Sequence, residues 1–192
     1  MSVLQQHCST LEKLAISEIT ILFDLLASCP RLQVLKSYGP VERWPGKPVA
    51  FITVQQLIDW DEDTDEYRPW PCEGTLQTLN IILAGLNPNE NEWVLHSKLY
   101  GRLARLTQLR ELRVEVVKEP QMKGLAMSLE FGLAQLSGLK KMEVLNMCVF
   151  THCPKRKDLE WMVKNWPRLR QIQGLEYKED KWFRNHLEHM NL

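Results

Sequence analysis

The chain has 192 residues and a formal net charge of zero, from 24 basic and 24 acidic side chains, and 44% of its residues are hydrophobic. These proportions are typical of a folded globular protein, and the lack of a basic excess argues against general nucleic-acid binding. Leucine is over-represented, with 30 copies in the 192 residues. A leucine surplus without a matching surplus of valine and isoleucine indicates helices or leucine-based repeats.

The cysteines and the N-terminal residues indicate the cellular compartment in which the protein is expected. The five cysteines are scattered and odd in number, which favours a reducing compartment over a disulfide-stabilised scaffold. The first residues have neither the basic start nor the apolar core of a secretory signal. The apolar stretch at 19–27 is interrupted by Thr20 and Asp24 and is too short to span a bilayer. We therefore expect a cytoplasmic or nuclear protein with no membrane association.

One short pattern recurs along the chain: a leucine, two variable residues, an aliphatic residue, one variable residue and a second aliphatic residue. The copies begin at Leu11, Leu32, Leu76, Leu109, Leu139 and Leu169. On a strand, the two later aliphatic positions are two residues apart and point to the same face. The pattern predicts parallel strands at about 11–17, 32–38, 76–82, 109–116, 139–146 and 169–174.

Segments with helical periodicity precede most of these copies, because their apolar residues recur at steps of three and four. These segments lie at 19–26, 93–106, 125–136 and 159–166. A single helix–strand unit cannot bury both of its apolar faces, but stacked units can. We predict an α/β fold: a leucine-rich-repeat solenoid of irregular repeats, with a parallel sheet on the concave side and helices on the convex side. The alternative is an irregular α+β domain.

We expect one domain over 1–192, with an insertion at about 40–74 and a C-terminal cap at about 157–192. The insertion contains proline-rich and glycine-rich stretches, which are typical of irregular structure. Its acidic residues alternate from Asp59 to Asp65, as they do at the start of a calcium loop, but the glycine and glutamate that such a loop requires are missing. A solvated loop or an acidic contact patch is the favoured interpretation.

The recurring pattern resembles that of leucine-rich repeat proteins. Cys8-Ser-Thr-Leu11 and Cys29-Pro-Arg-Leu32 resemble the cysteine-containing repeats that follow an F-box in ubiquitin-ligase receptors, and 158–175 is similar to the closing repeat of fungal F-box-like leucine-rich repeat proteins. The sequence departs from the ribonuclease-inhibitor type of repeat, which carries Asn or Cys where this chain has Ile19, Ala84, Val117 and Met147.

The resemblance implies a protein–protein interaction module. In its specific form, this module is the substrate-recognition part of an F-box type ubiquitin ligase receptor. The alternative is a non-enzymatic scaffold or assembly protein unrelated to ubiquitin. No F-box-length segment precedes the first repeat, so we expect that this chain alone does not bind a Skp1-type adapter.

The sequence contains no clear motif for metal binding, phosphate binding or catalysis. Cys148, His152 and Cys153 lie close together, and His186 and His189 form an H-x-x-H pair, but neither matches the paired spacing of zinc ligands. A basic run at 155–157 is interpreted as a solvated loop or a contact for phosphate or an acidic peptide. The chain has no nucleophile elbow and no glycine-rich phosphate loop. We expect no catalytic site, no metal, no cofactor and no small-molecule substrate.

The residues that flank the inward aliphatic positions are expected on the concave face, which solenoids use for binding. The candidate partner-binding residues are Lys13, Lys36, Tyr38, Asn80, Glu111, Arg113, Glu115, Lys141, Glu143 and Gln171, with Thr78 and Gln173 beside them. Their mixed charge suits a protein partner better than nucleic acid or a membrane. Arg113 and Lys141 are expected to form an adjacent basic pair on neighbouring strands.

Overall fold

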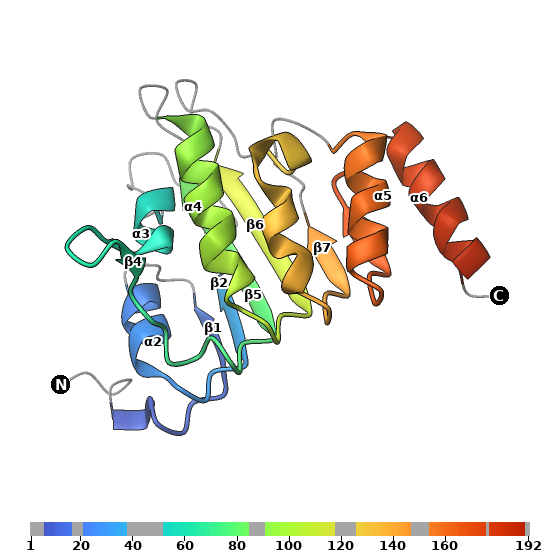
Figure 1. Cartoon of the computed structure of the whole chain (residues 1–192). Coiled ribbons are helices and arrows are strands. Elements are labelled where there is room, and N and C mark those ends of the chain that lie inside the picture. The colour runs from blue at the N-terminus through green and yellow to red at the C-terminus, as the bar shows by residue number, and fades with distance from the viewer. Residues whose placement is uncertain are drawn as a thin grey trace, which may run out of the picture.

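The computed structural model describes residues 6–16, 21–37, 52–84, 91–117, 126–146, 154–175 and 177–190. Its main feature is a six-stranded sheet in which every neighbouring pair of strands is parallel. The strands lie side by side in chain order: β1 (Lys13–Ile16), β2 (Val34–Ser37), β5 (Thr78–Ala84), β6 (Glu111–Val117), β7 (Val144–Asn146) and β8 (Gln171–Gln173). The predicted α/β class with a parallel sheet is confirmed (Figure 1).

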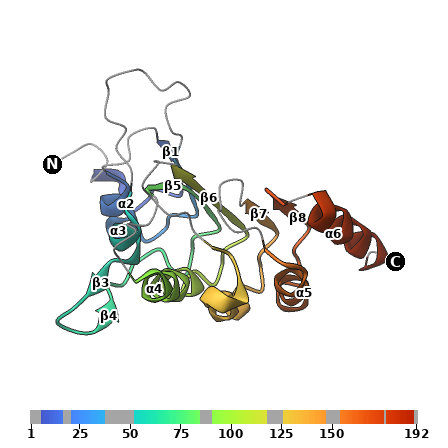
Figure 2. The same cartoon turned by 90° about the horizontal axis from the view of Figure 1, so that it is seen from above.

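The helical connections cover one face of this sheet. The helix α4 (Glu92–Ala104), two 3-10 segments, η2 (Leu129–Phe131) and η3 (Leu133–Gly138), and the helix α5 (Arg156–Asn165) follow one another along that face (Figure 2). The short helix α2 (Leu22–Ser28) connects β1 to β2, and α6 (Tyr177–Met190) follows β8 at the far end of the sheet. Helices therefore connect parallel neighbours, as the geometry of a parallel sheet requires.

Local sequence explains where the longer helices begin. The Asn91 side chain accepts a hydrogen bond from the Val94 N–H at the start of α4, which satisfies one of the free donors of a helix N-terminus. At the start of α5, the Asp158 carboxylate accepts from the Lys155 N–H (2.8 Å). The predicted helix at 125–136 is instead two 3-10 segments, because Gly132, with φ of +96°, interrupts the helical path between them.

The predicted insertion contains several described elements: a short helix α3 (Val54–Ile58) and the two-stranded antiparallel β3 (Trp60–Asp61) and β4 (Glu66–Tyr67). A capping box between Thr53 and Gln56 fixes the start of α3. The β3–β4 hairpin projects at the opposite end of the molecule from α6 (Figure 1).

A row of leucines lies between the sheet and the helices. Leu35, Leu79, Leu112 and Leu145 are register partners on four neighbouring strands and have no exposed surface. In contrast, Leu14, the equivalent residue of β1, is only partly buried because β1 is the edge strand. The predicted helical stripe is correct for Leu99 and Leu103 of α4 but wrong for Trp93, which is 59% exposed.

The fifth copy of the repeat pattern is shifted by three residues from its predicted position. Leu145, rather than Met142, pairs with Leu112. The turn before β7 shows the same shift. The Met142 N–H donates to the Leu139 carbonyl (3.1 Å), and the equivalent bond before β6 joins the Leu109 N–H to the Leu106 carbonyl (2.9 Å). The copy therefore begins at Met142. The predicted start at Leu139 was wrong because the pattern fits from either residue: Met142 lies three positions after Leu139, and Leu145 lies three positions after Met142.

This register predicts different costs for two neighbouring substitutions in β7. Leu145→Ala removes a side chain with no exposed surface, so it should lower the free energy of unfolding by about 2–5 kcal/mol. Val144→Ala removes a half-buried side chain on the other face and should cost about 1 kcal/mol or less. Urea unfolding curves of the two variants provide the measurement. Equal losses, or a larger loss for Val144→Ala, would contradict the observed register.

Candidate functional site

The candidate site is the open face of the sheet, the face directed away from α4 and α5. Side chains that alternate with the buried leucines form two rows on this face, each crossing all six strands. The first row consists of Lys13, Val34, Thr78, Glu111, Val144 and Gln171. The second row consists of Ala15, Lys36, Asn80, Arg113, Asn146 and Gln173. Residues two apart on a strand share a face, which is why the rows are regular.

Charged residues in the middle of the open face are held in ion pairs. Lys36 Nζ lies 3.8 Å from a Glu111 carboxylate oxygen, so this pair reaches across β5 from β2 to β6. Arg113 lies 2.7 Å from Glu115 on the same strand. All four side chains are between 34% and 42% exposed. Exposed pairs of this kind contribute at most about 1 kcal/mol, so these groups can exchange their partners for groups on a ligand at little cost.

Two asparagines of the second row are buried. Asn80 is 7% exposed and Asn146 is 3% exposed. The Asn146 side-chain N–H donates to the Gln173 amide oxygen (2.6 Å). The Asn80 Oδ1 atom is buried and accepts no hydrogen bond from any residue that the structure describes. A buried acceptor without a donor costs about 1–3 kcal/mol, so a donor supplied to Asn80 would be stabilising.

Most of the candidate binding residues lie on this face. Those on its strands are Lys13, Lys36, Asn80, Glu111, Arg113, Glu115 and Gln171. Tyr38 lies outside the described residues. Lys141 and Glu143 precede β7, so placing them on a strand was wrong. The expected adjacent pair of Arg113 and Lys141 is likewise wrong, because the neighbour of Arg113 on β7 is Asn146.

The three-residue shift of the fifth copy explains both errors. Lys141 Nζ hydrogen-bonds the Gln108 amide oxygen at the turns before β6 and β7. Val144 and Asn146 are open-face positions that the predicted frame concealed, and Val34 is an open-face position that flanks Leu35 but is absent from the candidate residues. The sequence pattern does mark Val144 and Asn146, because they flank Leu145 as Glu111 and Arg113 flank Leu112. These two positions can be recognised only when the fifth copy of the pattern is started at Met142.

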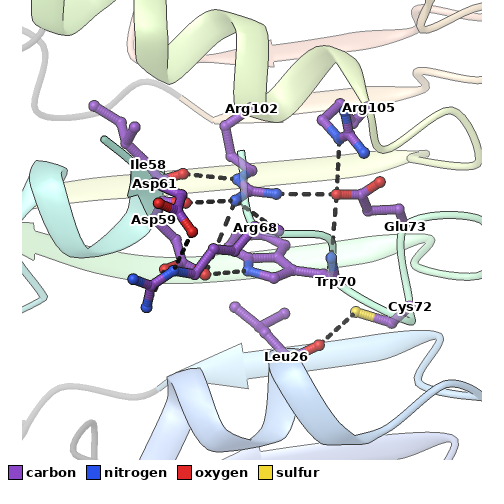
Figure 3. Close-up of polar contacts among 10 residues, drawn as sticks. All are labelled: Leu26, Ile58, Asp59, Asp61, Arg68, Trp70, Cys72, Glu73, Arg102 and Arg105. Atoms are coloured by element: carbon purple, nitrogen blue, oxygen red, sulfur yellow. Dashed lines mark hydrogen bonds and ion pairs between the residues drawn. The ribbon is translucent and has the colours of Figure 1, made fainter. Parts of the chain in front are cut away.

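A second cluster of polar residues fixes the insertion against α4 (Figure 3). Its centre is the Arg102 side chain, which has no exposed surface. The Arg102 guanidinium donates to a Glu73 carboxylate oxygen (2.9 Å) and to the backbone carbonyls of Ile58 (2.9 Å) and Arg68 (2.7 Å). A single arginine of α4 therefore satisfies acceptors from both sides of the β3–β4 hairpin.

Aromatic rings complete the surroundings of Arg102. The guanidinium carbon lies 4.3 Å from the centre of the Trp70 ring and 5.0 Å from that of Tyr67. The Tyr67 hydroxyl donates to the Lys98 carbonyl (2.7 Å), and a Cβ atom at Gly101 would overlap that hydroxyl. Burial lowers the pKa of Arg102, whereas the carboxylates of Glu73 and Asp59 oppose this effect. The cluster is a structural anchor, because hydrogen bonds and packing occupy the donors of Arg102.

The candidate metal ligands give no site in the described part of the chain. No group of three or more His, Cys, Asp or Glu side chains there is arranged to hold a metal ion. Cys8, Cys29 and Cys72 are buried and reduced. Burial raises the pKa of the Cys29 thiol to about 12 and that of Cys72 to about 11, so both thiols stay protonated at neutral pH. Cys148, His152 and Cys153, and the His189 side chain, lie outside the described residues.

Comparison with protein-family models, curated proteins and solved structures found no match for this chain. Among the described residues, no helix has the length and apolar character needed to cross a membrane. The open face and its surroundings are therefore the features from which a function is proposed.

The anchoring role of Arg102 predicts a large effect on stability. Arg102→Ala leaves the Glu73 carboxylate without its buried partner and should lower the free energy of unfolding by about 3–5 kcal/mol. Arg105→Ala is the matched control, since Arg105 contacts the same Glu73 oxygen at 2.9 Å but is 42% exposed. The control should cost at most about 1 kcal/mol. Chemical unfolding measures both, and similar losses in the two variants would rule out Arg102 as the anchor.

Proposed function

We propose that this chain is a leucine-rich-repeat solenoid that binds another protein on the open face of its sheet and has no enzymatic activity. The observation that carries the proposal is the pair of side-chain rows that crosses all six strands. Such rows provide a continuous surface of charged, amide and aliphatic groups. Surfaces of this composition recognise proteins through specific pairs of groups, rather than through one sign of charge.

The repeat arrangement is supported by the recurrence of one unit along the chain. In four of five successive units, the N–H of the residue that starts the pattern donates to the carbonyl three residues earlier, and in the unit that starts at Leu76 it donates to the carbonyl four residues earlier. The pairs are Leu32–Cys29, Leu76–Cys72, Leu109–Leu106, Met142–Leu139 and Leu169–Trp166. Strands in chain order with a common turn geometry are what stacked repeats produce.

A more specific form of the proposal is that the chain selects substrates for an F-box type ubiquitin ligase. Its support is the resemblance of the repeats at 8–11, 29–32 and 158–175 to those of F-box-associated proteins. The alternative is a scaffold or assembly protein unrelated to ubiquitin. Because this chain alone is expected not to bind a Skp1-type adapter, the test follows the captured partner: ubiquitylation of that partner that depends on both cullin and this chain supports the first form. Stable partner binding without such ubiquitylation supports the second.

Substitutions on the open face test the binding surface. Lys36→Ala and Arg113→Ala should each weaken partner binding by about 1–2 kcal/mol if the contact is central, because each removes a charge from the middle of the second row. The partner is first captured by affinity purification and identified by mass spectrometry. Its affinity for each purified variant is then measured by calorimetry, and circular dichroism checks that the fold is intact.

Glu160→Ala and Lys164→Ala on α5 are the matched controls, because both residues are exposed on the helical side. They should bind the partner as the unchanged chain does. If the α5 variants lose the partner and the open-face variants keep it, the helical side is the binding surface and the proposal is wrong.

A further inference from the structure

The turns that lead into β6, β7 and β8 carry a row of basic side chains. The row, here called the basic turns, consists of Arg110, Lys140, Lys141, Arg168 and Arg170. All are exposed except Lys141, which is half-buried. The equivalent turn before β2 has Arg31 as its single basic residue, and the turn before β5 has none. A chain with zero net charge therefore concentrates positive charge at one end of its sheet.

Contacts within the basic turns leave much of this charge unneutralised. The Glu143 carboxylate is shared between Arg110 (3.5 Å) and Arg170 (3.3 Å). Lys140 Nζ donates to the Asn165 backbone carbonyl (3.1 Å), and Lys141 Nζ to the Gln108 amide. Across the described ranges, no carboxylate forms an ion pair with Lys140, Lys141 or Arg168.

A groove adjoins the basic turns at the end of the sheet. It lies between β8 and α6, has a volume of about 320 Å³, and is lined by Arg170, Gln171, Ile172, Asp180, Phe183 and Arg184. Ile172 and Phe183 are apolar and at most 5% exposed, so they provide an apolar floor. Arg170 and Arg184 place guanidinium groups at the rim, where their side chains are 72% and 73% exposed, and each pairs with one carboxylate, Glu143 and Asp180 respectively. Asp180 pairs with Arg184 at 2.8 Å.

We propose that the basic turns and this groove form a docking site for an acidic segment of a partner protein, with an apolar side chain of that segment in the groove. Lysine and arginine bind carboxylates through charge-assisted hydrogen bonds, and arginine can do so with two bonds at once. The apolar floor favours a peptide over a nucleic-acid backbone, which has no aliphatic group to place there. The site goes beyond the proposed function, because the basic turns lie outside the rows of the open face, and of the six groove residues Gln171 alone belongs to those rows.

The dimensions indicate a short recognition element. Neighbouring strands lie about 4.8 Å apart, so the turn before β7 is roughly 5 Å from that before β8 and about 10 Å from the groove beyond it. An extended peptide covers about 3.3 Å per residue. The site therefore accommodates about three residues across the turns, with acidic side chains directed at Lys140 and Arg168, followed by the apolar residue in the groove.

Fluorescence anisotropy with the full chain tests this site. The probe is a fluorescein-labelled peptide of glutamates with one central leucine. Two comparison peptides have glutamine in place of glutamate, or serine in place of leucine. We expect saturable binding of the probe that weakens as salt is added, because the charges are exposed. Each comparison peptide should bind at least about fivefold more weakly, equivalent to about 1 kcal/mol.

Variants locate the binding. Arg168→Ala and the double variant Arg170→Ala/Arg184→Ala should each weaken binding of the probe by about fivefold or more. Arg31→Ala is the matched control, because Arg31 occupies the turn before β2 that corresponds to Arg168. Arg113→Ala, on the open face, separates this site from the proposed partner surface. Both controls should bind the probe as the unchanged chain does, and urea unfolding checks that all variants are folded.

Four outcomes would overturn the proposal. One is the absence of saturable binding. Another is equal binding of the glutamine peptide, and a third is equal losses in Arg168→Ala and Arg31→Ala. The fourth is evidence for a different occupant, which can take two forms. Tighter binding of a labelled single-stranded oligonucleotide would assign the basic turns to nucleic acid. Self-association that the probe reverses would assign them to a second copy of the chain.

Discussion

The fold depends on the burial of one leucine from each central strand. Leu35, Leu79, Leu112 and Leu145 meet at the same register and have no exposed surface. Burial of each such side chain contributes about 1.5–3 kcal/mol relative to its exposure to water. A shift of a strand by one residue would expose its leucine and bury its polar neighbours, so this row fixes the register of the sheet. Because the register is fixed, the intervening residues are directed to the opposite face in ordered rows.

The insertion is held by a different kind of interaction. Arg102 is removed from water, which lowers its pKa, and its guanidinium compensates by bonding Glu73 and backbone carbonyls. A buried charge of this kind adds little net stability, but losing its partner is costly. The anchor therefore specifies one position for the β3–β4 hairpin rather than strengthening the core. The exposed acidic residues at 62–66 are thereby kept at the end of the molecule opposite α6.

The two candidate surfaces differ in how their charge is arranged. On the open face, Lys36 and Arg113 are each paired with a glutamate, so a partner of the proposed kind would have to offer both signs of charge. In the basic turns, Lys140 and Arg168 lack such partners among the described residues, which favours an acidic ligand. A protein with two surfaces of this kind could hold two segments of one partner, or two partners, at once. In the first case the tethered second segment would bind at a raised effective concentration.

The sequence by itself determined the six strands of the main sheet, their parallel order and most of the open face, because strand periodicity places every second residue on one side, but it did not predict β3 and β4 in the insertion. It also identified α4 and α5 from their apolar spacing. It did not determine the frame of the fifth repeat, since Leu139, Met142 and Leu145 are all apolar and three residues apart. Only pairing with β6 decided between the two frames, and that choice moved Lys141 and Glu143 from the open face to the turns. The basic turns and the groove beside α6 were likewise decided by tertiary structure, because they join residues whose proximity depends on how successive units stack.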